Sequence, residues 1–358
     1  MKDKKVIFLI SSSIMGGAQV YIANLIEAIK DKYEVLLICP NGYLPEIVRK
    51  KSPKVKIIET KIGLSNIRNL KKIFDKEITD NTVINAHLLG TGFYSCLALK
   101  NIKNKLIVTL HQPILYEGIN FIKRIMYPHI IKRMSRRVDS YISVSNEIKD
   151  SLRLYTDREC VYIANAVPDI SPKKDILDVS QKDIINIGII GRLTEQKNHF
   201  VFLDAAKEIR KKKKNTSFYI IGDGELREEL KKYCCLLELD DCVYFVGAVN
   251  NPFDWMRKLD ILVFSSDFEG IPLTMLESMS VGLPIVSTDV GGVPDVIVNG
   301  KNGILVPAKD SIAISDSVIS LIEDDKLYTE IQETAISFIK SDLDYETNIA
   351  KYIGVIDK

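Results

Sequence analysis

Short apolar runs alternate with amphipathic segments along this sequence, and this alternation constrains its fold more than any other feature. Near-continuous runs of valine, isoleucine and leucine are typical of strands that are buried on both faces of a parallel sheet. Segments with helical spacing separate these runs, for example Val20–Ile29 and Ile67–Ile78. The pattern therefore predicts an α/β fold in which helices cover parallel sheets. The predicted strands are Lys5–Ile10, Glu34–Cys39, Val55–Glu59, Thr82–Ala86, Leu106–Leu110, Tyr141–Val144, Ile184–Ile190, Phe218–Ile221, Val243–Val246, Ile261–Phe264 and Ile285–Ser287.

A change in composition divides the chain into two such alternating halves. Residues 165–183 hold two prolines and many polar residues with little periodicity, which is typical of a linker. In doubly wound sheets the ligands bind at the carboxyl ends of the strands, and those ends can face one another across a cleft. We expect a first domain at residues 1–165, a linker at 166–183, a second domain at 184–335, and a helical tail at 336–358 that packs back toward the first domain.

The bulk composition argues against several classes of protein. The 358 residues carry a formal net charge of only +2, so no global field favours nucleic acid. The six cysteines form no CxxC pair, and none has zinc-ligand spacing to a histidine. We interpret them as reduced thiols of a cytoplasmic protein. The apolar run in the first ten residues, MKDKKVIFLI, is too short for a signal peptide or a membrane span.

The segment 267–303 carries the most chemical information. A helix is predicted at Pro272–Val281, and Glu277 is the only charged residue between Ile271 and Pro284. A lone carboxylate on a buried helix is costly unless a partner from elsewhere hydrogen-bonds it. The two vicinal hydroxyls of a ribose would suit this carboxylate, and a neighbouring loop would serve equally well in a purely structural role.

Glu269 precedes this helix, in the loop after the strand Ile261–Phe264. Gly270 beside it permits a ligand to approach the backbone closely. The unpaired N–H groups and the dipole at the start of the helix favour a phosphate there. One short segment can thus supply a carboxylate for a sugar, N–H donors for a diphosphate, and a second carboxylate for a ribose.

Two cations follow the strand Ile184–Ile190. Arg192 comes directly after Gly191, and Lys197 precedes a helix that is predicted from about Asn198. A guanidinium fork and an ammonium point charge together suit a diphosphate, although cations near loops are also common on ordinary surfaces.

In the first half, Gly16 and Gly17 follow the first strand and precede a helix, so this loop can approach a phosphate closely. The spacing G-x-G-x-x-G of a dinucleotide fingerprint is absent. His87 and His111 each follow a predicted strand, so we expect both side chains at the same edge of the sheet.

A basic and apolar segment occupies residues 121–137, and it holds no acidic residue. Such a segment is typical of an element on an anionic membrane surface, but an ordinary surface helix with an apolar stripe explains it equally well. Its cations, which we assign to the membrane or acceptor side, are Lys123, Arg124, Lys132, Arg133, Arg136 and Arg137.

These residues lie within motifs that resemble the retaining glycosyltransferases of family 4, also called glycosyl transferases group 1, which have the two-domain GT-B fold. The E-x7-E spacing of Glu269 and Glu277 is the most specific of these features. The matching motifs cover nearly the whole chain in order: GGAQ at 16–19, TLHQP at 109–113, ISVSNEIK at 142–149, IGIIGRLTEQKN at 187–198, YIIGDGEL at 219–226, VYFVGAV at 243–249, FEGIPLTMLESMSVGLPIVSTDVGGVPDVI at 268–297 and NGKNGILVP at 299–307.

The resemblance implies a role for each of these residues. Arg192 and Lys197 would hold the donor diphosphate and stabilise the leaving group. Glu277 would bind the ribose, Glu269 the sugar hydroxyls, and His111 would lie close to the transferred sugar. The implied catalytic residues are His111, Arg192, Lys197 and Glu269. The implied donor-binding residues are Gly16, Gly17, Arg192, Lys197, Val249, Glu269, Gly270, Ile271, Pro272, Leu273 and Glu277.

Such enzymes resemble front-face retaining catalysts, in which the leaving phosphate helps to deprotonate the acceptor and positive charge stabilises it. We therefore expect no metal and no cofactor, since the one D-x-D motif, Asp342 to Asp344, falls in the helical tail. The expected partners are a nucleotide-diphosphate sugar, with UDP as the nucleotide, and a saccharide acceptor that is lipid-linked. The expected setting is the assembly of a bacterial surface polysaccharide (O-antigen, capsule or lipopolysaccharide) at the inner face of the plasma membrane.

Two other functions share this architecture. A nucleotide-sugar 2-epimerase needs no acceptor, although the E-x7-E block resembles the transferases instead. A protein that binds a sugar nucleotide without catalysis would not need Arg192, Lys197, Glu269 and Glu277 together. Nucleic-acid binding has little support, because the basic residues follow no groove-binding motif.

Overall fold

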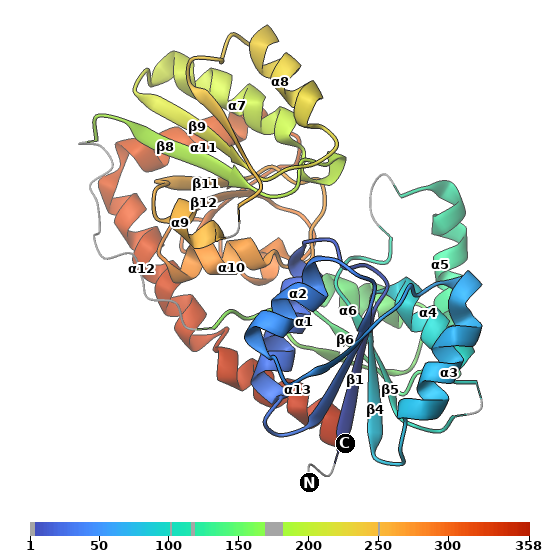
Figure 1. Cartoon of the computed structure of the whole chain (residues 1–358). Coiled ribbons are helices and arrows are strands. Elements are labelled where there is room, and N and C mark those ends of the chain that lie inside the picture. Colours follow the sequence, from blue (N-terminus) through green and yellow to red (C-terminus); the bar gives the residue numbers. More distant parts are fainter. Residues whose placement is uncertain (1–3, 101, 116–118, 169–181, 250) are drawn as a thin grey trace. The chain divides into compact units, whose positions relative to one another are not determined.

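The computed structural model describes residues 4–100, 102–115, 119–168, 182–249 and 251–358. They divide into two compact units, one that runs to Ala164 and resumes at Glu346–Lys358, and one of Asn165–Tyr345. Each unit holds a parallel sheet with helices on both faces (Figure 1). The predicted α/β fold with two doubly wound domains is therefore confirmed.

The first unit is built on a seven-stranded sheet in the order β3-β2-β1-β4-β5-β6-β7. Every residue of the central strand β1 is buried, as its unbroken apolar sequence predicts. Helices α1 and α2 lie on one face, and α3, α4 and α5 lie on the other (Figure 1). The elements are β1 Lys5–Ile10, α1 Gly17–Ile29, β2 Glu34–Cys39, α2 Tyr43–Lys51, β3 Lys56–Glu59, α3 Ile67–Glu77, β4 Thr82–His87, α4 Leu89–Ala98, β5 Leu106–Leu110, α5 Phe121–Met134, β6 Ser140–Ser143, α6 Asn146–Arg153 and β7 Glu159–Tyr162.

The second unit is built on a six-stranded sheet in the order β10-β9-β8-β11-β12-β13. Strand order reverses between β8 and β11, so the loops after these two strands emerge beside each other at one edge. Its elements are β8 Ile185–Ile190, α7 His199–Lys212, β9 Thr216–Ile221, α8 Arg227–Leu236, β10 Val243–Gly247, α9 Pro252–Met256, β11 Ile261–Phe264, α10 Leu273–Ser280, β12 Ile285–Thr288, β13 Ile304–Val306, α11 Ser311–Glu323 and α12 Asp325–Ser341.

All eleven predicted strands are present within one or two residues of their predicted ends. Two further strands, β7 and β13, have no counterpart among the predictions. Each lies at the edge of its sheet and is only partly buried, so its sequence lacks the continuous apolar run of a central strand.

The last helix, α13 (Tyr345–Asp357), packs on the first unit. Tyr352 stacks on Phe8 of β1 with ring centroids 6.3 Å apart, and its hydroxyl donates to Asn85 Oδ1 of β4 at 2.7 Å. Lys105 Nζ donates to the carbonyl of Val355 at 2.6 Å. The expected domain boundaries stay predictions, because residues 169–181 of the expected linker lie outside the described residues.

Candidate functional site

Hydrogen bonds join two loops of the second unit, the one after β8 and the one after β11. Gln196 Nε2 donates to the carbonyl of Phe268 at 2.9 Å, and Asp267 N donates to the carbonyl of Gln196 at 2.9 Å. Asn198, which has a left-handed φ of 47°, donates from Nδ2 to Asp267 Oδ1 at 2.8 Å. Ser265 Oγ donates to the carbonyls of residues 197 and 198. The loops therefore form one rigid platform, although they are about 70 residues apart in the sequence.

An ion pair links the two predicted site residues on this platform. Lys197 Nζ lies 2.5 Å from Glu269 Oε1, and Ser266 Oγ donates to the same oxygen at 2.7 Å. The two side chains are only 16% and 8% exposed, so water screens their attraction weakly. The family resemblance implies separate partners for these residues, the diphosphate for Lys197 and the sugar for Glu269. The structure shows that each also orients the other.

Two glycines allow the neighbouring loops to approach this platform. A Cβ at Gly222, whose φ is 140°, would lie 1.9 Å from the carbonyl oxygen of Gly191. A Cβ at Gly291, whose φ is 60°, would lie 1.9 Å from the carbonyl oxygen of Glu269. Neither glycine is among the residues predicted for the site, although both lie in the conspicuous motifs IIGDGEL and TDVGGVP. They are required because only glycine leaves room for such contacts.

Arg192 lies on the same platform but differs from Lys197 in its charge balance. Its side chain is exposed, and no acidic side chain among the described residues pairs with it. Because Glu269 neutralises Lys197, Arg192 supplies the uncompensated positive charge of this cluster. An anionic ligand at this edge would therefore be attracted mainly by Arg192.

Glu277 lies on α10, and its environment corrects one premise of our sequence argument. Six of the eight residues of α10 are buried, as predicted, but Glu277 and Thr274 are partly exposed. These two are three positions apart and therefore share one face of the helix. Glu277 thus lies on the partly exposed face of an otherwise buried helix.

The other predicted donor-binding residues of the second unit surround the start of α10. Pro272 is the N-cap, so the helix begins one residue later than predicted, at Leu273. Gly270, Ile271, Pro272 and Leu273 are buried, and Asn165 Nδ2 fixes the carbonyl of Ile271 at 2.6 Å. The first N–H groups of the helix have no partner within it, so this end suits an anion. Val249 is partly buried in the loop after β10.

In the first unit, Gly16 and Gly17 lie at the amino end of α1. Gly16 is the N-cap with an extended φ of −179°, and Gly17 is the first residue of the helix. A Cβ added at Gly17 would meet nothing within 4 Å, so the space beside it is open. Gln19 Nε2 donates to the carbonyl of Ser12 at 2.9 Å and closes this loop.

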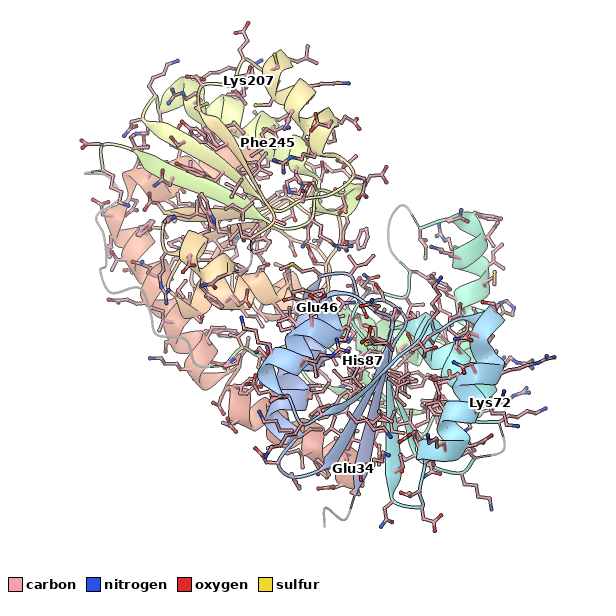
Figure 2. The ribbon with its side chains drawn as sticks, viewed as in Figure 1. Glu34, Glu46, Lys72, His87, Lys207 and Phe245 are labelled. Atoms are coloured by element: carbon pink, nitrogen blue, oxygen red, sulfur yellow. The ribbon has the colours of Figure 1, made fainter. Side chains whose placement is uncertain are left out.

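His87 and His111 meet at the carboxyl ends of β4 and β5, as expected. Nδ1 of His87 lies 2.9 Å from Nε2 of His111, and the rings are stacked with centroids 5.2 Å apart. Figure 2 shows His87 at the opposite end of the first sheet from Glu34. Burial and the neighbouring His111 lower the pKa of His87 well below its usual range, and burial lowers the pKa of His111 to about 3. Both rings are therefore neutral at neutral pH.

The basic and apolar segment forms α5, whose two halves differ. Ile131 and Met134 are buried in the core of the first unit. At the amino end, Phe121 and Ile122 are 73% and 63% exposed, and Ile125 and Met126 are each 50% exposed. Four of the first six residues of the helix are thus exposed apolar side chains, and the other two are the cations Lys123 and Arg124.

Arg137 has to be removed from the set of cations assigned to the membrane. Its Nη2 donates to the carbonyls of Ile102 at 2.9 Å and Asn104 at 2.7 Å. Its Nη1 pairs with Asp139 at 3.4 Å. Arg137 therefore stabilises the fold of the first unit.

Within the described residues, no group of three or more histidine, cysteine, aspartate or glutamate side chains could hold a metal ion. No helix in the same part of the chain is long and apolar enough to cross a membrane.

Two family profiles match this chain in succession. Residues 15–169 match the family described as Glycosyltransferase Family 4, and residues 185–324 match the one described as Glycosyl transferases group 1. A glycosyltransferase of Methanocaldococcus jannaschii is 41% identical over 28% of this chain, a region that spans 25% of that relative's own length.

Longer alignments link the chain to relatives with named activities. The N-acetylgalactosamine-N,N'-diacetylbacillosaminyl-diphospho-undecaprenol 4-alpha-N-acetylgalactosaminyltransferase of Campylobacter jejuni is 25% identical, over 87% of this chain and 88% of that protein. The O-antigen biosynthesis glycosyltransferase WbnH of Escherichia coli is 27% identical, over 85% of this chain and 86% of that protein. The structure of HepE from Anabaena, solved with UDP and glucose, has a TM-score of 0.86 at 17% identity and covers 99% of this chain and 100% of that one.

Proposed function

The chain belongs to the family 4 glycosyltransferases, and from this premise we propose that it moves a sugar from a UDP-sugar to a hydroxyl of a saccharide, with retention of configuration at the anomeric carbon. The observation that carries this proposal is the platform of the second unit, which holds Arg192 and the Lys197–Glu269 pair just before α10 begins at Leu273. UDP is chosen because the structurally similar HepE was solved with UDP and glucose.

In this proposal, each residue of the platform has a distinct part in donor binding. Arg192 and the amino end of α10 bind the diphosphate. Glu277 accepts hydrogen bonds from the ribose, and the second oxygen of Glu269 accepts from the sugar hydroxyls. Because Glu269 is already fixed by Lys197 and Ser266, its orientation does not have to be ordered on binding.

Positive charge performs the central step of the reaction. As the glycosidic bond breaks, negative charge grows on the departing diphosphate, and Arg192 and Lys197 stabilise it. The leaving oxygen takes the proton of the attacking hydroxyl, so no nucleophile of the protein and no metal is required.

The acceptor in this proposal is a lipid-linked saccharide in the assembly of a surface polysaccharide such as O-antigen. The names of the Campylobacter jejuni and Escherichia coli relatives support this choice. The amino half of α5 supports contact with an anionic membrane, since apolar side chains and cations are exposed there together.

A panel of UDP-, GDP- and ADP-sugars tests the donor, with slow hydrolysis and thermal stabilisation as readouts. Stabilisation by a UDP-sugar and release of UDP support the proposal, and no response to any nucleotide sugar would refute it. Formation of an epimerised UDP-sugar in the absence of acceptor would indicate a 2-epimerase instead.

Flotation with anionic liposomes tests the membrane contact separately. The informative variant replaces Phe121 and Ile122 with serine, and a second variant reverses Lys132, Arg133 and Arg136. Arg137 is left unchanged because it stabilises the fold. Wild-type protein that does not float, or variants that float equally well, would contradict a membrane role for α5.

A further inference from the structure

The pair of histidines in the first unit has a feature that donor binding by the platform does not explain. His87 is fully buried, and its Nε2 has no hydrogen-bond partner among the described residues. Its other nitrogen, Nδ1, contacts Nε2 of His111 at 2.9 Å. His111 is only partly buried, so its own Nδ1 is the nitrogen of the pair that can face a ligand.

The proton in this contact belongs to one ring or the other. A neutral imidazole carries one N–H, and the hydrogen bond at one nitrogen decides the state of the other. If His111 donates from Nε2, then His87 must carry its N–H on Nε2, where this buried donor meets no acceptor. If His87 donates from Nδ1, only a lone pair is left unpaired on its Nε2. Buried donors without an acceptor are rarer than buried acceptors without a donor, so the second arrangement is favoured.

The surrounding structure holds His87 rigidly in this position. Its ring stacks on Phe8 with centroids 5.8 Å apart. The next residue, Leu88, has a φ of 76°, which is strained for a leucine, and its N–H donates to the carbonyl of Thr109 at 2.9 Å. Two residues before His87, Asn85 Nδ2 donates to Thr109 Oγ1 at 2.9 Å. Strand β4 is thus fixed against β5 on both sides of the histidine, and the strain at Leu88 is maintained by these contacts.

We propose that His87 is a positioning residue that fixes His111 as the tautomer with its proton on Nδ1. His111 then presents an N–H donor, and it binds an oxygen of the transferred sugar through that donor. This inference rests on the proposed function and on the expectation from the family resemblance that His111 lies close to the transferred sugar. His87 itself touches no substrate and acts only through His111.

The tautomer can be measured directly by NMR. The chain has four histidines, so protein labelled with 15N-histidine gives a simple two-bond 1H–15N spectrum, in which protonated and bare ring nitrogens resonate far apart. Single variants assign the signals, including His129→Gln at the exposed ring of α5. The expected result is His111 protonated on Nδ1. His111 protonated on Nε2 would overturn the proposal.

Two substitutions at His87 separate positioning from packing. His87→Asn places an amide N–H near the position of Nδ1. His87→Leu fills the buried space with an apolar side chain that has no hydrogen-bond donor. We expect His87→Asn to retain the Nδ1–H tautomer and kcat within a few-fold. In His87→Leu, we expect His111 to become a mixture of tautomers and kcat to fall by about 10- to 100-fold, the range seen when the hydrogen bond that orients a metal-ligating histidine is lost. Equal losses in both variants, or an unchanged tautomer and kcat in His87→Leu, would refute positioning.

The readouts also distinguish this inference from the proposed function. If no nucleotide sugar is a substrate, turnover is absent while the tautomer of His111 is still measured. If His87→Leu does not fold, which circular dichroism detects, the wild-type spectrum and His87→Asn still decide the question.

Discussion

Replacing Glu269 with glutamine tests the ion pair on which the platform of the second unit depends. The change removes the charge but keeps an oxygen that accepts from Ser266. At 2.5 Å and an effective dielectric constant of about 20, Coulomb's law gives a gross attraction of about 7 kcal/mol between Lys197 and Glu269. Desolvation offsets most of this, but removing one partner leaves a buried ammonium without compensation. We therefore expect Glu269→Gln to lower the free energy of unfolding by about 3 to 5 kcal/mol.

The assay exploits the position of the single tryptophan. Trp255 lies on α9 of the second unit, so its fluorescence reports the unfolding of the unit that holds the pair. With a urea dependence of about 2 kcal/mol per molar, a loss of 3 kcal/mol lowers the midpoint of unfolding by about 1.5 M. The matched control is Glu228→Gln, since the Glu228–Lys231 pair of the same unit is 75% and 44% exposed. We expect this control to change stability by less than about 1 kcal/mol.

The double variant completes the cycle. Lys197→Met together with Glu269→Gln leaves no unpaired charge, so its loss should be smaller than the sum of the single losses by at least about 2 kcal/mol. Additive losses would refute the reasoning, because they would mean that the two charges do not interact in the folded protein. The double variant should nevertheless be inactive, since both side chains are assigned to the donor.

The charge of Arg192, the close contact at Gly291 and the burial of His199 give three further predictions. Arg192→Ala should lower kcat more than it raises KM, because the negative charge that Arg192 stabilises grows in the transition state. Steady-state kinetics that show an effect on KM alone would contradict this. Gly291→Ala should lower the free energy of unfolding, measured with urea, by more than about 3 kcal/mol, because its Cβ would lie 1.9 Å from the carbonyl oxygen of Glu269. The matched control is Gly300→Ala, which has a similar φ of 73° but open space, and it should lower the free energy of unfolding by about 1 kcal/mol. Burial lowers the pKa of His199 to about 3, so below pH 6.5 the unfolded chain binds a proton at this residue that the folded protein does not bind. The stability of the second unit should therefore fall by about 1.4 kcal/mol per pH unit as the pH decreases from 6.5. In His199→Leu the same fluorescence measurement should show a shallower slope.

Much of the fold follows from local patterns that the sequence displays directly. A strand buried on both faces must be apolar throughout, so its ends can be found without knowing its neighbours. The same pattern locates the polar residues that follow strands, and Arg192, Glu269 and the two histidines lie after strands as predicted. The edge strands β7 and β13 escaped prediction because one of their sides needs no apolar cover.

Patterns along the chain thus predict two doubly wound units, the motifs of the family and the residue types at each strand end. The tertiary structure alone decided which of these residues pair. Lys197 and Glu269 are 72 positions apart, and they meet because β8 and β11 are neighbours in the sheet. His87 and His111 meet because β4 pairs with β5 in one register. The tertiary structure also decides the contacts of Arg137, which donates hydrogen bonds to the backbone carbonyls of Ile102 and Asn104. Charge and polarity are properties of a residue, but distance and burial are properties of the packed chain, and only these decide which interactions form.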